Sequence, residues 1–143
     1  MSVLDLVAME RIRLADALDE LDAHQWEQQS LCGRWTNHQV AAHLVVPFDV
    51  SMPKFVLAML KARGNFDVVN DAMAREMAER RTPGDCVDHL RDKAQHPFKP
   101  PGFGHEAPLN DVITHGGDIL EPLGRSVDPD PESLEIVLAL MAS

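Results

Sequence analysis

Hydrophobic residues recur along most of the chain at the three- and four-residue spacing of amphipathic helices. The apolar positions from Leu4 to Leu21 follow this spacing with charged residues between them, which predicts one long helix over about residues 3–23. A loop is expected to follow, over residues 24–35.

The second helix has an unusually complete start signal. Thr36 is a predicted N-cap, and Gln39 completes a Thr-x-x-Gln capping box, in which each residue bonds to the backbone of the other. Trp35 and Val40 flank this box at the spacing of a hydrophobic staple. The pattern predicts that the helix runs through residues 37–45.

Prolines and glycines divide the rest of the chain. The second helix is expected to kink or restart at Pro47 and Pro53. Residues 96–108 contain four prolines and two glycines, which predicts a loop. Further helices are expected over residues 54–63, 66–81, about 84–95, about 109–120 and about 132–142.

Few β-branched residues alternate with polar ones, and no internal repeat occurs. We therefore expect an all-α fold, a four-helix bundle with short additional helices. The 143 residues, of which 45% are hydrophobic, suit a single domain with one core over residues 1–143.

Composition narrows the classes of partner. The net charge is −10, with no block of basic residues, so the surface repels phosphate backbones and anionic membranes and attracts dissolved cations. We expect no nucleic-acid or membrane partner. We expect no signal peptide, and no apolar run approaches the roughly 18 residues of a membrane span. Two isolated cysteines, Cys32 and Cys86, favour a reduced, cytoplasmic protein.

Candidate chemistry is concentrated on two of the predicted helices. On an ideal helix Asp111, His115 and Asp118 lie within about 60° of one another, at the border of the apolar stripe. His43 occupies a similar border on the second helix. A bundle that buries both stripes could bring His43 towards Asp111 and His115, and two imidazoles with a carboxylate can hold a divalent metal. The alternative is a surface Asp–His pair that stabilises the helix by a few tenths of a kcal/mol.

Three segments carry a resemblance to a known family. Residues 26–45, 47–67 and 108–124 resemble the mycothiol-dependent maleylpyruvate isomerase N-terminal family of the DinB-like (YfiT-like) superfamily, which is found in actinobacteria and bacilli. The segments occur in the family's order and cover nearly the whole chain. We therefore expect a DinB-like four-helix bundle.

The resemblance also implies a metal site. By position, the ligands are His43, Asp111 and His115, and the ion is a divalent metal, most commonly zinc or nickel. Asp118 would orient a ligand imidazole through its free N–H. The family's isomerase has glutamate at the position of Asp111, and it carries a C-terminal domain that we expect to be absent here.

The resemblance implies that the metal activates a low-molecular-weight thiol, mycothiol in actinobacteria. We predict a mycothiol-dependent transferase or isomerase that acts on an electrophilic small molecule, with the thiol as nucleophile. Residues 96–108 would form a lip over the site, with Lys99 or His105 as substrate contacts. The alternative is a non-enzymatic dimerisation or partner-binding module whose metal site is structural or vacant. Apolar faces on six helices are compatible with a homodimer under both hypotheses.

Two glycines directly follow the predicted ligand His115. Each costs a helix interior about 1 kcal/mol relative to alanine. We hypothesise that Gly116 and Gly117 remove bulk beside the ligand, so that a neighbouring helix or the bound thiol can approach. Alanine at either position should then weaken metal or thiol binding.

Overall fold

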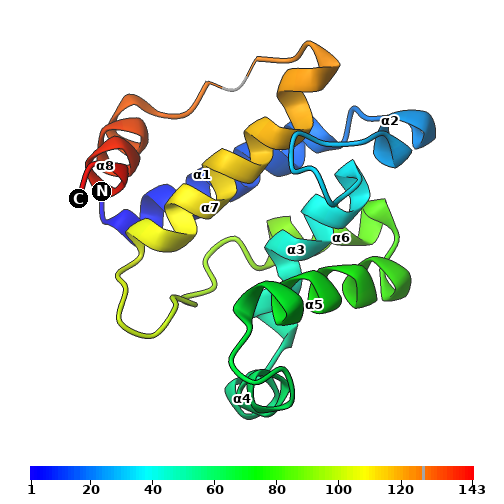
Figure 1. Cartoon of the computed structure of the whole chain (residues 1–143). Helices are drawn as coiled ribbons and strands as arrows, with labels where there is room; N and C mark the ends of the chain where they lie inside the picture. Colours follow the sequence, from blue (N-terminus) through cyan, green and yellow to red (C-terminus); the bar gives the residue numbers. More distant parts are fainter. Residues whose placement is uncertain (127) are drawn as a thin grey trace.

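The computed structural model describes residues 1–126 and 128–143, and within these residues it contains helices but no β-strand (Figure 1). The all-α prediction is confirmed. The α-helices are α1 (Val3–Leu18), α2 (Ala23–Glu27), α3 (Asn37–Asp49), α4 (Met52–Lys61), α5 (Phe66–Arg80), α6 (Pro83–Asp92), α7 (Glu106–Leu120) and α8 (Pro131–Met141). A 3-10 turn, η1 (Glu121–Leu123), extends α7.

The start of α3 follows the predicted capping box. The Thr36 hydroxyl accepts a hydrogen bond from the Gln39 N–H at 3.3 Å, and the Gln39 side chain accepts one from the Thr36 N–H at 3.0 Å. Pro47 lies inside α3, and the chain restarts after it at α4, with Ser51 as N-cap. The predicted interruption between the two prolines is therefore confirmed.

Several predicted boundaries are wrong. The second helix runs to Asp49 and not to residue 45, the helix predicted over 84–95 ends at Asp92, and the loop predicted over 24–35 contains most of α2. The first helix ends at Leu18, and a second capping box starts α2, in which Asp22 and Gln25 bond to each other's backbone (2.8 and 3.0 Å). The late helix begins at Glu106, three residues before the expected start. Pro108 is tolerated there because the first turn of a helix has no internal partner for its N–H groups.

The main core draws on α1, α2, α3, α5, α6 and α7. α1 contacts α6 and α7, and α3 contacts the same two helices and also α5. The assignment of this fold to the four-helix bundle class stays a prediction. The N-terminal end of α1 and the start of α7 pack against α8 through a smaller cluster formed by Leu6, Val7, Leu109 and Val137. The N- and C-termini lie close together beside α8 (Figure 1).

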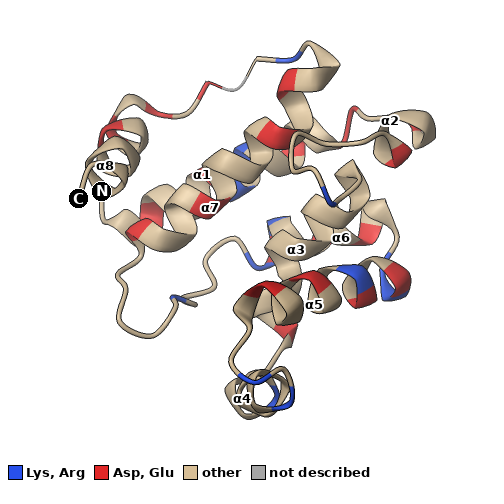
Figure 2. Ribbon diagram, in the orientation of Figure 1, with Lys and Arg blue, Asp and Glu red and all other residues tan. Residues whose placement is uncertain are grey.

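The helix α4 lies apart from this core. It contacts α5 but buries none of its own residues. Acidic side chains occur on most other helices, whereas α4 carries only basic charges (Figure 2). In the described residues, no single helix has the length and hydropathy of a membrane span. α3 and α4 taken together have that length and hydropathy, but the two helices are bent by 119° relative to each other.

Candidate metal centre

The three predicted ligands come together where α3 packs against α7. His43 projects from α3, and Asp111 and His115 project from successive turns of α7. The Asp111 Oδ1 lies 3.4 Å from His43 Nε2 and 3.3 Å from His115 Nε2. Donor atoms of all three residues lie within 4.8 Å of one another. His43 and Asp111, which are 68 positions apart in the sequence, are thus brought together by one helix contact.

These separations suit a shared ion better than direct hydrogen bonds. Good N–H···O bonds measure about 2.7–3.2 Å between heavy atoms, and both contacts to Asp111 are longer. Two ligands at about 2.1 Å from a tetrahedral zinc ion lie about 3.4 Å apart, because the edge of a tetrahedron is about 1.6 times the centre-to-corner distance. The observed spacing therefore leaves room for an ion between the donors.

Neighbouring side chains fix the two imidazoles. The ring of Trp35 stacks on His43, with ring centroids 4.9 Å apart, and Trp35 Nε1 donates a hydrogen bond to Asp71 at 2.9 Å. His115 Nδ1 lies 3.0 Å from Asp118 Oδ2. This contact directs His115 Nε2 towards Asp111, the arrangement that orients a metal-binding histidine.

The second nitrogen of His43 has a different environment. His43 Nδ1 is buried and has no hydrogen-bond partner among the described protein atoms. The outward-facing Nε2 is therefore the only nitrogen of His43 that meets polar neighbours, here Asp111. Coordination by His43 would use this atom.

Electrostatics couples Asp111 to the histidines. Burial raises the pKa of the Asp111 carboxyl, but contacts with His115 and His43 outweigh it and hold the pKa well below its usual range. Burial lowers the pKa of His115, whereas Asp111 and Asp118 raise it, and the net shift is upward. Protons therefore compete with a cation for His115 as the pH falls.

A second group of potential donors shares His115. Cys32, His115 and Asp118 also place donor atoms within 4.8 Å of one another. No base near Cys32 could be predicted from the sequence, because His115 and Asp118 are remote from it along the chain. Burial and the charge of Asp118 raise the pKa of the Cys32 thiol, so this thiol is a weaker nucleophile than an ordinary cysteine near neutral pH.

A cavity of about 720 Å³ opens beside the three residues, and His43, Asp111 and His115 lie on its wall. Much of the remaining wall is apolar and aromatic, including Phe48 and Phe55. This volume and lining are typical of a site for a small organic molecule. The cavity places such a molecule next to the donor atoms.

The proline-rich segment forms part of this wall. His96, Phe98, Pro100 and Pro101 line the cavity, as a lip over the site would. Of the residues that the structure describes, neither Lys99 nor His105 lines the cavity. The His105 ring instead contacts the Pro97 carbonyl (3.2 Å). The predicted substrate contacts of Lys99 and His105 are therefore not supported.

The cavity also has a charged residue that the sequence analysis missed. Arg11 lies on its wall, projecting from α1. The available signal was its position, four residues after Val7 and three before Leu14, which places an arginine on the apolar stripe of the first helix.

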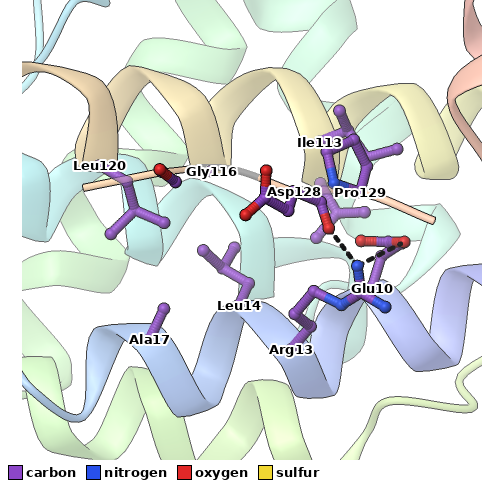
Figure 3. A pocket seen from close by; sticks show the side chains of 11 residues that line it. Glu10, Arg13, Leu14, Ala17, Ile113, Gly116, Leu120, Asp128 and Pro129 are labelled. Atoms are coloured by element: carbon purple, nitrogen blue, oxygen red, sulfur yellow. Dashed lines mark hydrogen bonds and ion pairs between the residues drawn. The ribbon is translucent and has the colours of Figure 1, made fainter. Parts of the chain in front are cut away.

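The paired glycines have unequal surroundings. A Cβ at Gly116 would lie 3.1 Å from Leu14 Cδ1, so this glycine allows α1 to approach α7 closely (Figure 3). A Cβ at Gly117 would meet only the flexible Glu121 side chain, at 3.7 Å. The hypothesis that a glycine allows a neighbouring helix to approach therefore fits Gly116. Neither glycine lines the large cavity, so the hypothesis that they make room for the thiol is not supported.

Comparison with known protein families gives a match. The model of a family described as mycothiol maleylpyruvate isomerase N-terminal domain matches residues 7–97, more than half of the chain. His43 lies inside this range, whereas Asp111 and His115 lie outside it. No curated protein and no solved structure matches the chain significantly.

Proposed function

The chain belongs to the mycothiol maleylpyruvate isomerase N-terminal domain family, which is DinB-like, and from this we propose that it is a metal-dependent enzyme that uses a small thiol. The proposed reaction is a transfer or isomerisation in which the thiol, with mycothiol as the first candidate, attacks an electrophilic small molecule. The family is associated with mycothiol and with metal binding.

One observation carries the proposal. His43 Nε2, Asp111 Oδ1 and His115 Nε2 converge from two helices at the separations expected for ligands of one ion. Two imidazoles and one carboxylate suit zinc or nickel, and three protein ligands leave a position open to a further molecule. The strongly negative net charge favours the arrival of a cation.

Each group has a proposed task. A divalent ion at this site would supply Lewis acidity, which lowers the pKa of a thiol at the open position and makes it a nucleophile near neutral pH. His43, Asp111 and His115 hold the ion, and Asp118 holds His115 in the required orientation. The apolar cavity wall binds the carbon skeletons of thiol and substrate and excludes water from them.

Metal analysis tests the ligand set. Wild type, after titration with zinc or nickel and removal of excess, should retain about one ion per chain. His43→Ala should retain none while circular dichroism shows the same helix content. His24→Ala is the matched control, because His24 is an exposed histidine on α2. A wild type that binds neither metal would overturn the proposal.

Thiol binding tests the next step. In protein loaded with cobalt in place of zinc, added mycothiol should produce the near-ultraviolet charge-transfer band of a thiolate bound to cobalt. The band should be absent from His43→Ala. Without such a band in metal-loaded wild type, the site would be metal-binding but not thiol-activating.

A second candidate function rests on α4. Its exposed apolar side chains include Leu57 and Leu60, which lie beside basic Lys54 and Lys61. A second copy, with its net charge of −10, would cover the apolar side chains and match the basic ones. Sedimentation of wild type and Leu57→Lys tests this; a monomeric wild type would exclude the dimerisation module, whatever its metal content.

A further inference from the structure

Arg11 is a buried charge without a matching acid. The residue is 5% exposed, and its guanidinium carbon lies 4.9 Å from the centre of the Phe48 ring. Among the described residues, no carboxylate lies within ion-pair distance of its guanidinium. A buried charge in this state is costly unless something else neutralises it.

The hydrogen bonds of Arg11 use only part of its capacity. Nη1 donates to the carbonyls of Ala94 and His96, both at 3.0 Å. These bonds hold the end of α6 and the start of the loop that lines the cavity. A guanidinium has five N–H donors, and those on Nε and Nη2 have no partner among the described residues.

The charge persists at neutral pH. Burial lowers the pKa of the Arg11 guanidinium to about 10, although the charge of Asp111 opposes this. A pKa near 10 still leaves the group protonated at pH 7.

The position of Arg11 connects it to the candidate metal centre. Arg11, Phe48 and His96 line the same cavity as His43, Asp111 and His115. A ligand in that cavity can therefore meet the metal ligands and the guanidinium together. Planar carboxylates match the fork of N–H donors that a guanidinium presents.

We propose that Arg11 is the anion-binding residue of this cavity, and that the cavity's ligand carries a carboxylate or similar anion on an apolar body. This inference deepens the proposed function by naming a chemical class for the ligand. It rests on the proposed function only for the reaction that this ligand would undergo. The anion site itself is formed by α1 and the cavity wall, and it needs no metal.

A matched pair of probes tests the inference in wild-type protein. 4-Fluorobenzoate and 4-fluorobenzamide have nearly the same shape, but only the first is charged. Their binding is measured by fluorine NMR on zinc-loaded protein and on chelator-treated protein. The acid should bind about tenfold or more tightly than the amide in both forms, because a charge-assisted hydrogen bond is worth more than a neutral one.

Two outcomes would overturn the inference. Equal affinity for acid and amide would show that no anion site exists. A preference for the acid only in zinc-loaded protein would show that the carboxylate binds the metal and not Arg11. A preference for the acid that persists without metal would support the anion site even if the chain bound neither zinc nor nickel. The anion-site proposal and the metal-site proposal can therefore fail independently of each other.

Variants assign the effect to the residue. Arg11→Gln should weaken binding of 4-fluorobenzoate about tenfold and leave 4-fluorobenzamide unchanged. Arg11→Lys should retain part of the preference. Arg80→Gln, which removes a half-exposed arginine from α5, is the matched control and should bind both probes as wild type does.

A second measurement, made on wild type, tests the inference even if Arg11→Gln does not fold. In wild type, the Arg11 Nε–H signal in a proton–nitrogen spectrum, assigned from its absence in Arg11→Lys, should shift on addition of 4-fluorobenzoate. The amide should not shift it. An unshifted signal at a saturating concentration of the acid would refute the assignment, since a purely structural clamp would not respond to the anion.

Discussion

At the residue scale, Asp111 is the centre of the candidate site. Its Oδ1 faces both His43 and His115, and its side chain is 41% exposed, which leaves it open to the cavity and to solvent. The carboxylate thus joins two helices by charge, at distances that an ion could bridge.

The Asp111–His115 pair should make the stability of the metal-free protein depend on pH. The pKa of His115 is raised in the folded state, so its contribution is present below the unfolded value of about 6.5 and is lost as the pH rises through the folded value. The lowered pKa of Asp111 adds a contribution present above about 3.8. Chelator-treated wild type should therefore exceed Asp111→Asn in melting temperature by more at pH 5 than at pH 9.

The size of this difference is limited by solvent. Because the Asp111 side chain is 41% exposed, the pair should contribute about 1 kcal/mol or less, a few degrees in a chain of this length. Differential scanning calorimetry at both pH values checks it. A difference that grows with pH would contradict the shifts described here.

Asp118 should affect the metal without binding it. Its carboxylate fixes His115 through Nδ1, so Asp118→Asn should lower zinc affinity about 10- to 100-fold and leave the stoichiometry at about one. Competition with a chromophoric chelator measures the affinity. Asp88→Asn, which removes an exposed carboxylate on α6, is the matched control; equal affinities of the two variants would remove Asp118 from the site.

At the element scale, α7 carries two of the three candidate ligands and a close contact with α1. One side of this helix presents Asp111 and His115 to α3, and Gly116 faces Leu14 of α1. The helix therefore lies between two partners, and the glycine serves the contact with α1 and not the ligand side (Figure 3).

The two glycines should respond differently to alanine. Gly117→Ala should raise the free energy of unfolding by about 0.5–1 kcal/mol, since helix propensity improves and the new Cβ meets only Glu121. Gly116→Ala should gain less or lose stability, because its Cβ would crowd Leu14 at 3.1 Å. Urea denaturation measures both.

A double variant controls this comparison. Leu14→Ala removes the crowded methyl groups, so Gly116→Ala should cost less in that background than in wild type. If Gly116→Ala stabilises wild type as much as Gly117→Ala does, close approach of α1 does not explain the glycine.

At the scale of the whole molecule, the core extends well beyond the candidate site, which it meets at Trp35. The main hydrophobic cluster includes Leu18, Trp35, Val45 and Met77, so it draws on several helices and does not depend on an ion. Metal binding should consequently add to the stability of a chain that is already folded.

Zinc should raise the melting temperature without being required for folding. At a free concentration about 100 times the dissociation constant, a ligand that binds only the folded state adds about 2.7 kcal/mol. Chelator-treated wild type should keep its helical circular dichroism and melt at a lower temperature than the zinc-loaded form. As a control, zinc should not change the melting temperature of His43→Ala. An unfolded chelator-treated wild type would instead indicate a structural metal site.

Local sequence signals determined much of the helical architecture. The Thr36–Gln39 capping box, the restart after Pro47 and the Pro83 and Pro131 starts each depend on residues a few positions apart, so the chain specifies them without its tertiary structure. The long first helix was predicted wrongly because the Asp22–Gln25 box, which is equally local, was overlooked.

The candidate site was accessible to sequence only in part. The spacing of Asp111, His115 and Asp118 determined their common side of α7, and the border position of His43 on its helix made it a candidate third ligand. The family resemblance pointed to the same residues. What only the tertiary structure decided is everything that depends on which helices pack together: the 3.3–3.4 Å separations at Asp111, the approach of Leu14 to Gly116, and the shared cavity wall of Arg11. Periodicity gives the face of a helix that is buried, but it contains no information on the partner that buries it.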